Sequence, residues 1–576
     1  MNDSERELRK ERDPFEIGTS LMDVYVGWVR NDPAGLNRMM ADLAGRFHAV
    51  WLEEWTRFSQ FLFSDEGQGK DEPGKFREFV GNYGQLARKF HSVFVKWTRE
   101  FTAGAPGVSD RTRLRALFWA DRILQSIAPA NFFWTNPGAV RKFFETEGDS
   151  LLRGLENRLA DLRRGEFWGR MVDSTAFRVG ENLAVAPGAV VFRNDLMELI
   201  QYEPATEETY SAPIVFVQPW VNKFYVFDLC NESSFVRWMT RNGYTVFITS
   251  WKNPSSEMAG IRFEDYMIRG AMKAAEVAME ICGNRKVHAA GYCIGGTVLA
   301  AMMAWANRAL DSSRIPVADW TLFSALTDFS EPGELGVFIS EPAIGAIEGL
   351  MKKKGYLDKF FISSVFRLLG SESLIWRNSV QNYLYGGTPP RSDVLFWNDD
   401  GTRLPEAMCS YYLREFYLKN RLAQKDGTVL GGVPVDLGRI RQPLYVVAAE
   451  QDHISPWKSA FRTCGLAGGP VRFVLTTEGH ITGIVNPPSE RSRRKFWAGE
   501  YAGEGDAETW LSGRTERKGS WWPDWLEWMQ EKSLPKTSPP ATGSPRYPPL
   551  CRSPGIYVLE NGMGGSTGGN TGGNRR

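Results

Sequence analysis

The chain has 576 residues, of which 43% are hydrophobic and 24% charged, and its formal net charge is +1. This is the composition of a globular protein that is long enough for a large core and a second domain. The balanced charge gives no reason to expect nucleic acid or an anionic membrane as the main partner. No apolar run reaches the roughly 18 residues that a membrane helix needs, so no membrane span is expected.

The cysteines and the first residues indicate the compartment. Six cysteines lie far apart without CxxC pairs, and the opening MNDSERELRKERDPFE has no apolar signal segment. Both features predict a reduced, cytoplasmic protein. Aromatic residues make up 13% of the chain. A plain core does not require that many, so some are expected to line an apolar path or surface.

The first part of the chain is expected to be helical. Apolar residues recur at every third or fourth position over 36–63, and a second such stretch covers 76–101. This spacing is typical of amphipathic helices. Two interpretations of the first apolar face stay open, packing on a neighbouring helix and docking on an apolar surface or partner. The face includes Phe47, Trp51, Trp55, Phe58 and Leu62.

Near Ala212 the pattern changes to short β-branched runs that alternate with helical segments. This alternation predicts a mainly parallel sheet covered by helices. A long insertion, 328–441, follows the fourth expected strand, and because it is too long for a loop it is predicted to be a cap or lid. The expected strands are 213–217, 244–250, 286–290, 320–326, 444–449 and 471–476.

The segment Ala290-Gly-Tyr-Cys-Ile-Gly-Gly296 has the outline of a G-x-S-x-G nucleophile elbow in which cysteine replaces serine. It joins an expected strand to an expected helix. Cys293 would therefore lie at a helix N-terminus, where unpaired N–H groups and the helix dipole favour a thiolate. The alternative is a buried, inert cysteine in a Gly-rich turn. The other five cysteines lack such a setting and are expected to be structural.

A cysteine nucleophile needs a base, and the chain has five histidines. Asp452 follows the strand expected at 444–449 and His480 follows the strand expected at 471–476. These are the places where α/β-hydrolases carry their acid and histidine, and the chain order Cys293, Asp452, His480 matches their triad. His453 is predicted to give a supporting hydrogen bond, with the role of base as the alternative. The remaining histidines are predicted to be structural: His48, His91 and His288.

The oxyanion hole of this fold is expected to use the N–H of Ile294 and a second N–H from the loop after 213–217, where Trp220 or Val221 is the candidate. A thiol suits a substrate that is already a thioester, because thiolate attack yields a second thioester of similar energy. That thioester can pass its acyl group to an alcohol, which favours acyl transfer from coenzyme A over hydrolysis. No cofactor or metal is expected, since the CoA thioester is itself the substrate.

With these motifs the sequence resembles the polyhydroxyalkanoate synthases, in particular the class I type that polymerises short (R)-3-hydroxyacyl-CoA. The similarity covers about 128–559 and includes PWVNKFYVFDL (219–229), GYCIGGT (291–297), FWNDDGTRLP (396–405) and EGHITGIVNPP (478–488). The resemblance implies that Cys293 carries the acyl group and growing chain, that His480 is the general base, and that Asp452 orients or assists it. It also implies that Trp397 lies beside the nucleophile.

The expected organisation is a helical N-terminal domain (1–175), an α/β-hydrolase-like catalytic domain (176–533) with a cap at about 328–441, and a tail (534–576). The tail is rich in Pro and Gly and is expected to be largely disordered. The resemblance implies that the N-terminal domain serves association, here into a homodimer, and attachment to polyester granules. Two alternative functions stay open, a cysteine-dependent thioesterase or polyester depolymerase of the same fold, and a catalytically silent granule-coat protein.

Overall fold

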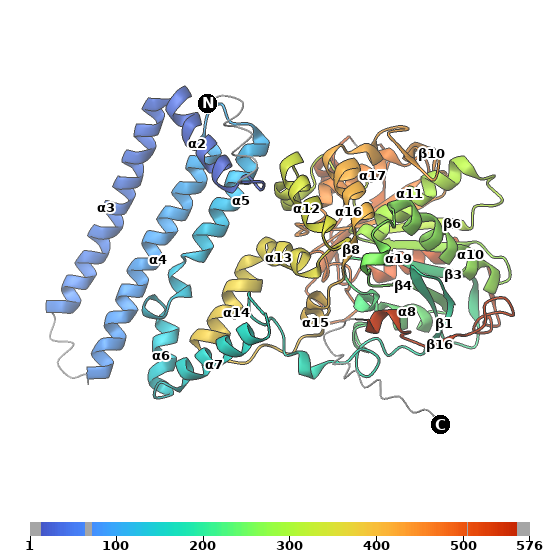
Figure 1. The fold of residues 1–576 in the computed structure, drawn as a ribbon, viewed down its shortest axis with the longest axis horizontal. Helices are drawn as coiled ribbons and strands as arrows, with labels where there is room; N and C mark the ends of the chain where they lie inside the picture. The colour runs from blue at the N-terminus through green and yellow to red at the C-terminus, as the bar shows by residue number, and fades with distance from the viewer. Residues whose placement is uncertain (1–12, 64–71, 504, 561–576) are drawn as a thin grey trace. The chain divides into compact units, whose positions relative to one another are not determined.

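The computed structural model describes residues 13–63, 72–503 and 505–560, and the chain forms two compact units (Figure 1). Unit 1 consists of Met1–Asp173 and Ser364–Arg391, and unit 2 of Ser174–Ser363 and Ser392–Arg576. Within the described ranges, no helix combines the length and the apolar character that crossing a membrane would require.

Unit 1 is built from helices. Both amphipathic segments expected from the sequence form long helices, which confirms that prediction. Their inner faces meet where the ring of Phe47 lies 5.4 Å from that of Phe90, and where the Trp97 indole N–H donates to the Met39 carbonyl at 2.7 Å. The helices before residue 174 are α2 (Ile17–Asn31), α3 (Pro33–Phe63), α4 (Glu72–Gly104), α5 (Asp110–Ser126), α6 (Pro137–Glu145) and α7 (Asp149–Arg163).

The segment Ser364–Arg391 folds onto α7 through polar contacts. The Asn157 amide donates to the carbonyls of Asn382 and Gly387 at 3.0 and 2.9 Å, and the Tyr383 hydroxyl donates to the buried Asp161 carboxylate at 2.9 Å. The expected cap is therefore not one piece, because its middle belongs to unit 1. The segment contains the end of α13 (Lys359–Leu369), then η9 (Glu372–Trp376), α14 (Arg377–Ser379) and η10 (Val380–Leu384).

Unit 2 contains a large mixed sheet with strand order β14-β13-β12-β11-β6-β5-β3-β4-β2-β1-β16. The six strands predicted from the sequence are the parallel centre of this sheet, from β12 to β4. The antiparallel strands at both edges were not predicted. The sheet strands up to β6 are β1 (Gly188–Arg193), β2 (Met197–Tyr202), β3 (Thr209–Val217), β4 (Tyr244–Trp251), β5 (Val287–Tyr292) and β6 (Val317–Phe323). Those after the cap are β11 (Leu444–Ala449), β12 (Val471–Thr476), β13 (Lys495–Glu500) and β14 (Arg517–Lys518).

Helices cover this sheet (Figure 1). The Phe235 ring of α8 stacks on Trp522 of α19 with centroids 4.2 Å apart, so segments almost 300 residues apart share one part of the core. A mixed sheet with a parallel centre of six strands, helices between these strands and an insertion after β6 define an α/β-hydrolase fold with a cap, which confirms the predicted fold class. The helices around the sheet are α8 (Phe235–Arg241), η7 (Tyr266–Met272), α10 (Lys273–Ile281), α11 (Ile294–Ala309), α17 (Trp457–Leu466), α18 (Ala507–Ser512) and α19 (Trp522–Gln530).

The tail differs from the prediction of disorder over its described part, 534–560. Its strands β15 (Lys536–Thr537) and β16 (Cys551–Arg552) pair with β3 and β1. The buried Gln201 side chain accepts from the Gly543 N–H at 2.8 Å and donates to the Ala541 carbonyl at 3.1 Å. The prediction was wrong because composition does not reveal that the outer strand β1 and the start of β3, ahead of its pairing with β5, supply hydrogen-bond partners to this Pro-rich segment. The Gly-rich end, 561–576, lies outside the described residues.

Candidate active site

Cys293 lies at a sharp turn between β5 and α11. Its φ of 53° is in the left-handed region that non-glycine residues rarely adopt, and its N–H donates to the Phe323 carbonyl at 2.9 Å. A Cβ at Gly295, in the first turn of α11, would collide with the carbonyl oxygens of Val217 and Gln218, so this position requires glycine. The strained turn and the close approach of helix to strand are the features of a nucleophile elbow.

The structure brings Asp452 and His480 together after the ends of β11 and β12. The His480 Nδ1 lies 2.7 Å from the Asp452 Oδ2, and both residues are buried. The second carboxylate oxygen of Asp452 accepts from the N–H groups of Ile454 and Ser455 at 2.9 and 2.8 Å. These contacts fix the carboxylate, which in turn orients the imidazole toward the cysteine.

The charges around His480 determine its protonation. Burial alone would lower its pKa, but the Asp452 carboxylate and the Cys293 sulfur, through charge and hydrogen bonding, outweigh burial and raise the pKa to about 10. At neutral pH the imidazole therefore holds a proton between these two groups. Its positive charge stabilises negative charge on the sulfur, which is the condition for a reactive thiolate.

The loop after β3 lies next to the elbow, as the contact of Gly295 with its first residues requires. Within the described part of the chain, the Ile294 N–H has no protein acceptor, and neither has the N–H of Trp220 or of Val221, the two candidates for the second donor. Trp220 is almost fully buried between the rings of Trp251 and Tyr266. Backbone donors left unpaired beside a nucleophile can bind an oxyanion.

Comparison with known proteins places this arrangement in a family. Residues 81–239 match the family described as Poly-beta-hydroxybutyrate polymerase (PhaC) N-terminus. The chain is 36% identical to the Poly(3-hydroxyalkanoate) polymerase subunit PhaC of Rhizobium meliloti (strain 1021), over 96% of this chain and 91% of the relative. It is 37% identical to the Poly(3-hydroxyalkanoate) polymerase of Methylorubrum extorquens, over 94% and 90%. The chain belongs to the poly(3-hydroxyalkanoate) polymerase family.

A third relative agrees with this assignment. The Poly(3-hydroxyalkanoate) polymerase subunit PhaC of Cupriavidus necator is 38% identical over 86% of each chain. The resemblance found in the sequence is thereby confirmed, and with it an acyltransferase-type enzyme of poly(3-hydroxyalkanoate) synthesis.

Two tyrosines that were not predicted lie within range of the charge of Cys293. Tyr412 and Tyr417 belong to a π-helix, η11 (Tyr412–Leu418), whose wider turn places residues five apart on one face. Their ring centroids lie 5.3 Å apart. Burial, and in addition the charge of Cys293, hold the pKa of both phenols above the ordinary value, so both can donate hydrogen bonds. The sequence shows the repeated tyrosines of YYLREFY, but it does not show that this segment forms a π-helix, which is what brings Tyr412 and Tyr417 to the same face.

Trp397 and His453, also predicted as site residues, differ in burial: the first is buried and the second is exposed. Trp397 is buried on α15 (Asp393–Asp399), and its indole N–H donates to the Lys223 carbonyl at 2.6 Å, in the loop after β3. Its place beside the nucleophile stays a prediction. His453 is exposed next to Asp452. His288, assigned as structural, is buried and held by Asp319 at 2.7 Å.

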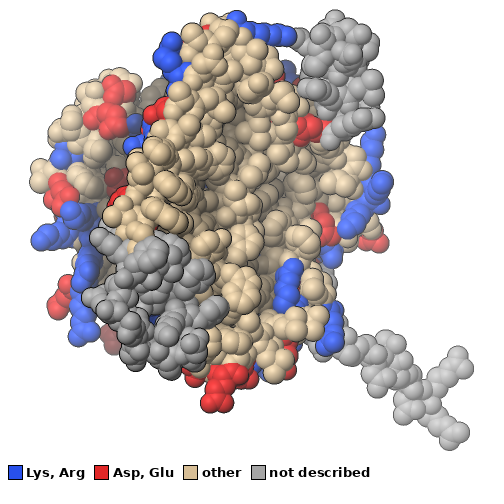
Figure 2. Space-filling view, turned by 90° about the vertical axis from the view of Figure 1, so that its left-hand side faces the viewer, with Lys and Arg blue, Asp and Glu red and all other residues tan. Residues whose placement is uncertain are grey.

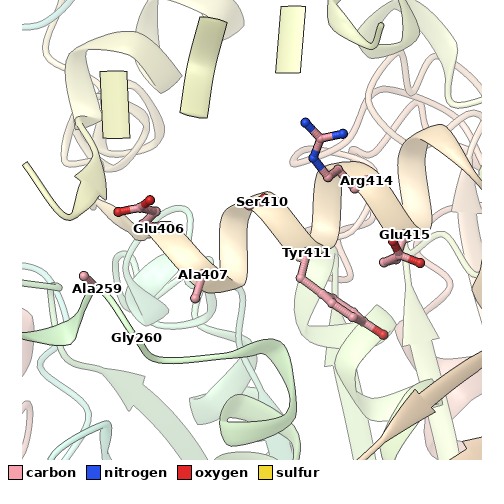
Figure 3. A pocket seen from close by; sticks show the side chains of 8 residues that line it. All are labelled: Ala259, Gly260, Glu406, Ala407, Ser410, Tyr411, Arg414 and Glu415. Carbon is pink, nitrogen blue, oxygen red and sulfur yellow. The ribbon is translucent and has the colours of Figure 1, made fainter. Parts of the chain in front are cut away.

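An open pocket of about 620 Å³ lies along the cap helix formed by α16 (Glu406–Tyr411) and η11 (Figure 3). Tyr411 and Arg414 leave this helix on opposite sides. Arg414 is paired with Glu348 and Glu341, each at 2.7 Å, so its positive charge is compensated within the cap. The lining contains no triad residue and consists of Ala259, Gly260, Glu406, Ala407, Ser410, Tyr411, Arg414 and Glu415.

Proposed function

We propose that the protein polymerises (R)-3-hydroxyacyl-CoA into polyester and releases coenzyme A, through a thioester on Cys293. The observation that carries this proposal is the buried Asp452–His480 pair, 2.7 Å between Oδ2 and Nδ1, next to a strained cysteine at the elbow. The names of the relatives support the product. The proposed partners are the acyl-CoA, the surface of polyester granules in the cytoplasm, and a second copy of the chain.

Each proposed step has a defined proton path. The Cys293 sulfur attacks the thioester carbonyl, the Ile294 and Val221 N–H groups bind the oxyanion, and CoA leaves with the proton that His480 carries. His480 then removes the proton from the 3-hydroxyl of another acyl unit, and the alkoxide attacks the Cys293 thioester. An ester forms and the cysteine sulfur is released, so that no cofactor is required beyond the CoA thioester itself.

Product analysis separates this proposal from the alternatives. Incubation of the purified protein with (R)-3-hydroxybutyryl-CoA is expected to yield CoA and polymer. Free 3-hydroxybutyrate with equimolar CoA would instead indicate a thioesterase. Release of 3-hydroxybutyrate from added polyester would indicate a depolymerase. Absence of CoA release from every acyl-CoA tested would favour the silent coat protein.

Replacing Asp452 by asparagine is expected to slow chain elongation more than the first acylation. Asp452 opposes the effect of burial on the His480 pKa, so its removal lowers that pKa and weakens the base. A 3-hydroxyl is a much weaker acid than a thiol, so its deprotonation should suffer more. Mass spectrometry of trapped acyl-enzyme measures the first step, and polymer formation measures the second.

The matched control for this variant is Asp319→Asn, which alters the other buried Asp–His pair, with Nδ1 of His288 at the same 2.7 Å separation. It is expected to leave the ratio of acylation to elongation unchanged. Equal losses of acylation and elongation in Asp452→Asn would mean that Asp452 only holds the imidazole tautomer.

The outer side of α3 supports the proposed attachment to granules. Phe47 packs inward, whereas Trp51 and Trp55 are 46% and 49% exposed and stack with centroids 5.6 Å apart. Figure 2 looks onto the side of the molecule where α3 lies in Figure 1, and large areas of it carry few charged side chains. The side chains of Phe58 and Leu62, also assigned to this face, lie outside the described residues. Exposed paired indoles suit adsorption to a water-insoluble polyester.

The double variant Trp51→Ala/Trp55→Ala is expected to leave granules roughly 30-fold more readily, because two half-exposed indoles each contribute about 1 kcal/mol when buried, or about 2 kcal/mol together. Cell fractionation into granule-bound and soluble protein measures this, together with the lag before polymerisation. Leu114→Ala/Ile123→Ala on α5 is the control, since both side chains are 46% exposed. An unchanged distribution of the tryptophan variant would contradict the role of this surface.

A further inference from the structure

The loop after β3 is held by a distant segment of the cap, residues 397–402. Asn222 and Gly401 form an antiparallel bridge, and the Asn222 amide donates to the Trp397 carbonyl at 3.3 Å. In return, the Trp397 indole N–H donates to the Lys223 carbonyl at 2.6 Å, although the two residues are 174 positions apart. The loop that carries the candidate oxyanion donor is therefore shaped by the cap.

A buried ion pair joins the same two segments. The Nζ of Lys223 lies 3.0 Å from an Oδ1 of Asp400, and these side chains are 4% and 1% exposed. The Tyr225 hydroxyl donates to the other oxygen of Asp400 at 2.8 Å. Separating the two segments would leave a buried charge without its partner, which is strongly unfavourable. The ion pair therefore holds the segment 397–402 against the loop after β3.

Thr402 makes the contacts nearest to the candidate donor. Its buried hydroxyl lies 2.5 and 2.8 Å from the carbonyl oxygens of Trp220 and Val221, which share its single proton, and its N–H donates to the Val221 carbonyl at 3.1 Å. The Trp220 carbonyl and the Val221 N–H belong to one planar peptide group and point in opposite directions. Holding that carbonyl therefore fixes the direction of the N–H.

We propose that Thr402 is a positioning residue for the oxyanion hole, which holds the Trp220–Val221 peptide so that the Val221 N–H meets the carbonyl oxygen attacked by Cys293. This inference rests on the proposed function, because the oxyanion forms only when an acyl thioester is attacked. Thr402 acts through the peptide and not on the sulfur. Its loss should thus impair stabilisation of the tetrahedral intermediate and spare the reactivity of the thiolate.

The test is Thr402→Val, which keeps the shape of the side chain and removes the hydroxyl. First-turnover CoA release from (R)-3-hydroxybutyryl-CoA is expected to slow about 10- to 100-fold with little change in KM, since one misdirected oxyanion donor is lost. Alkylation of Cys293 by iodoacetamide should keep its wild-type rate and pH profile, because attack on an sp³ carbon forms no oxyanion. Thr402→Ser retains the hydroxyl and should recover most of the activity.

Thr240→Val is the matched control, because this equally buried threonine also donates its hydroxyl to a backbone carbonyl, that of Arg237 at 3.1 Å. It should leave acylation and alkylation unchanged. The proposal would be overturned if Thr402→Val acylated at a rate within twofold of the wild-type rate. It would also be overturned if the alkylation rate of Thr402→Val fell as much as its acylation rate, or if Thr402→Ser acylated as slowly as Thr402→Val. Should Thr402→Val fail to fold, Thr402→Ala replaces it under the same criteria. Absence of CoA release from the wild type would instead refute the proposed function.

Discussion

Replacing Cys293 by alanine is expected to abolish polymer formation and CoA release while the fold persists. The thiolate is the proposed acyl carrier, and loss of the nucleophile from a hydrolase triad costs about 10⁶ in rate. Alanine removes only a half-buried sulfur, so the core around the elbow stays packed. CoA release and polymer mass measure the loss, and circular dichroism with a melting curve tests the fold.

Cys293→Ser should be nearly as poor as Cys293→Ala. An unactivated hydroxyl is a weaker nucleophile than a thiolate, and the ester that it forms is a weaker acyl donor than a thioester. Cys230→Ala is the control, since Cys230 is also half-buried and its sulfur contacts the Ser233 hydroxyl at 3.0 Å. Polymer from purified Cys293→Ala would refute the covalent mechanism. Wild-type turnover by the serine variant would refute the thioester argument alone.

Replacing His480 by glutamine is expected to lower the rates of both acylation and elongation by about 10² to 10⁴, the usual cost of losing a general base. Glutamine can still hydrogen-bond to Asp452 but cannot carry a proton between the sulfur and the hydroxyl. The charge that stabilises negative sulfur is lost as well. Alkylation of Cys293 by iodoacetamide near neutral pH should therefore also slow, in contrast to Thr402→Val.

His453→Gln is the control for that variant, because His453 is exposed beside Asp452. It is expected to retain most of the activity. If His453→Gln proved the more damaging change, the assignment of base and supporting histidine would be reversed. A His480→Gln variant with normal elongation would mean that another group deprotonates the incoming hydroxyl.

The central strands and the meeting of Asp452 with His480 were predictable because local patterns and topology coincide. β11 and β12 have the bounds expected from their β-branched runs, and parallel strands end at the same edge of a sheet. Asp452 and His480, each a few residues beyond its strand, were therefore expected to meet, and they lie 2.7 Å apart. The missed edge strands β1, β2 and β13 pair antiparallel with partners that are not marked in their own sequence.

From the sequence alone came the α/β-hydrolase core, the chain order of the candidate triad Cys293, Asp452 and His480, and the helices α3 and α4, because these depend on periodicity and on residues near in sequence. Three features are visible only in the tertiary structure: the pairing of the tail with β3 and β1, the packing of 364–391 on α7, and the contact of Thr402 with the loop after β3. These contacts join segments separated by well over a hundred residues, and each depends on backbone groups that every residue type carries. Only the folded chain shows which of those groups meet.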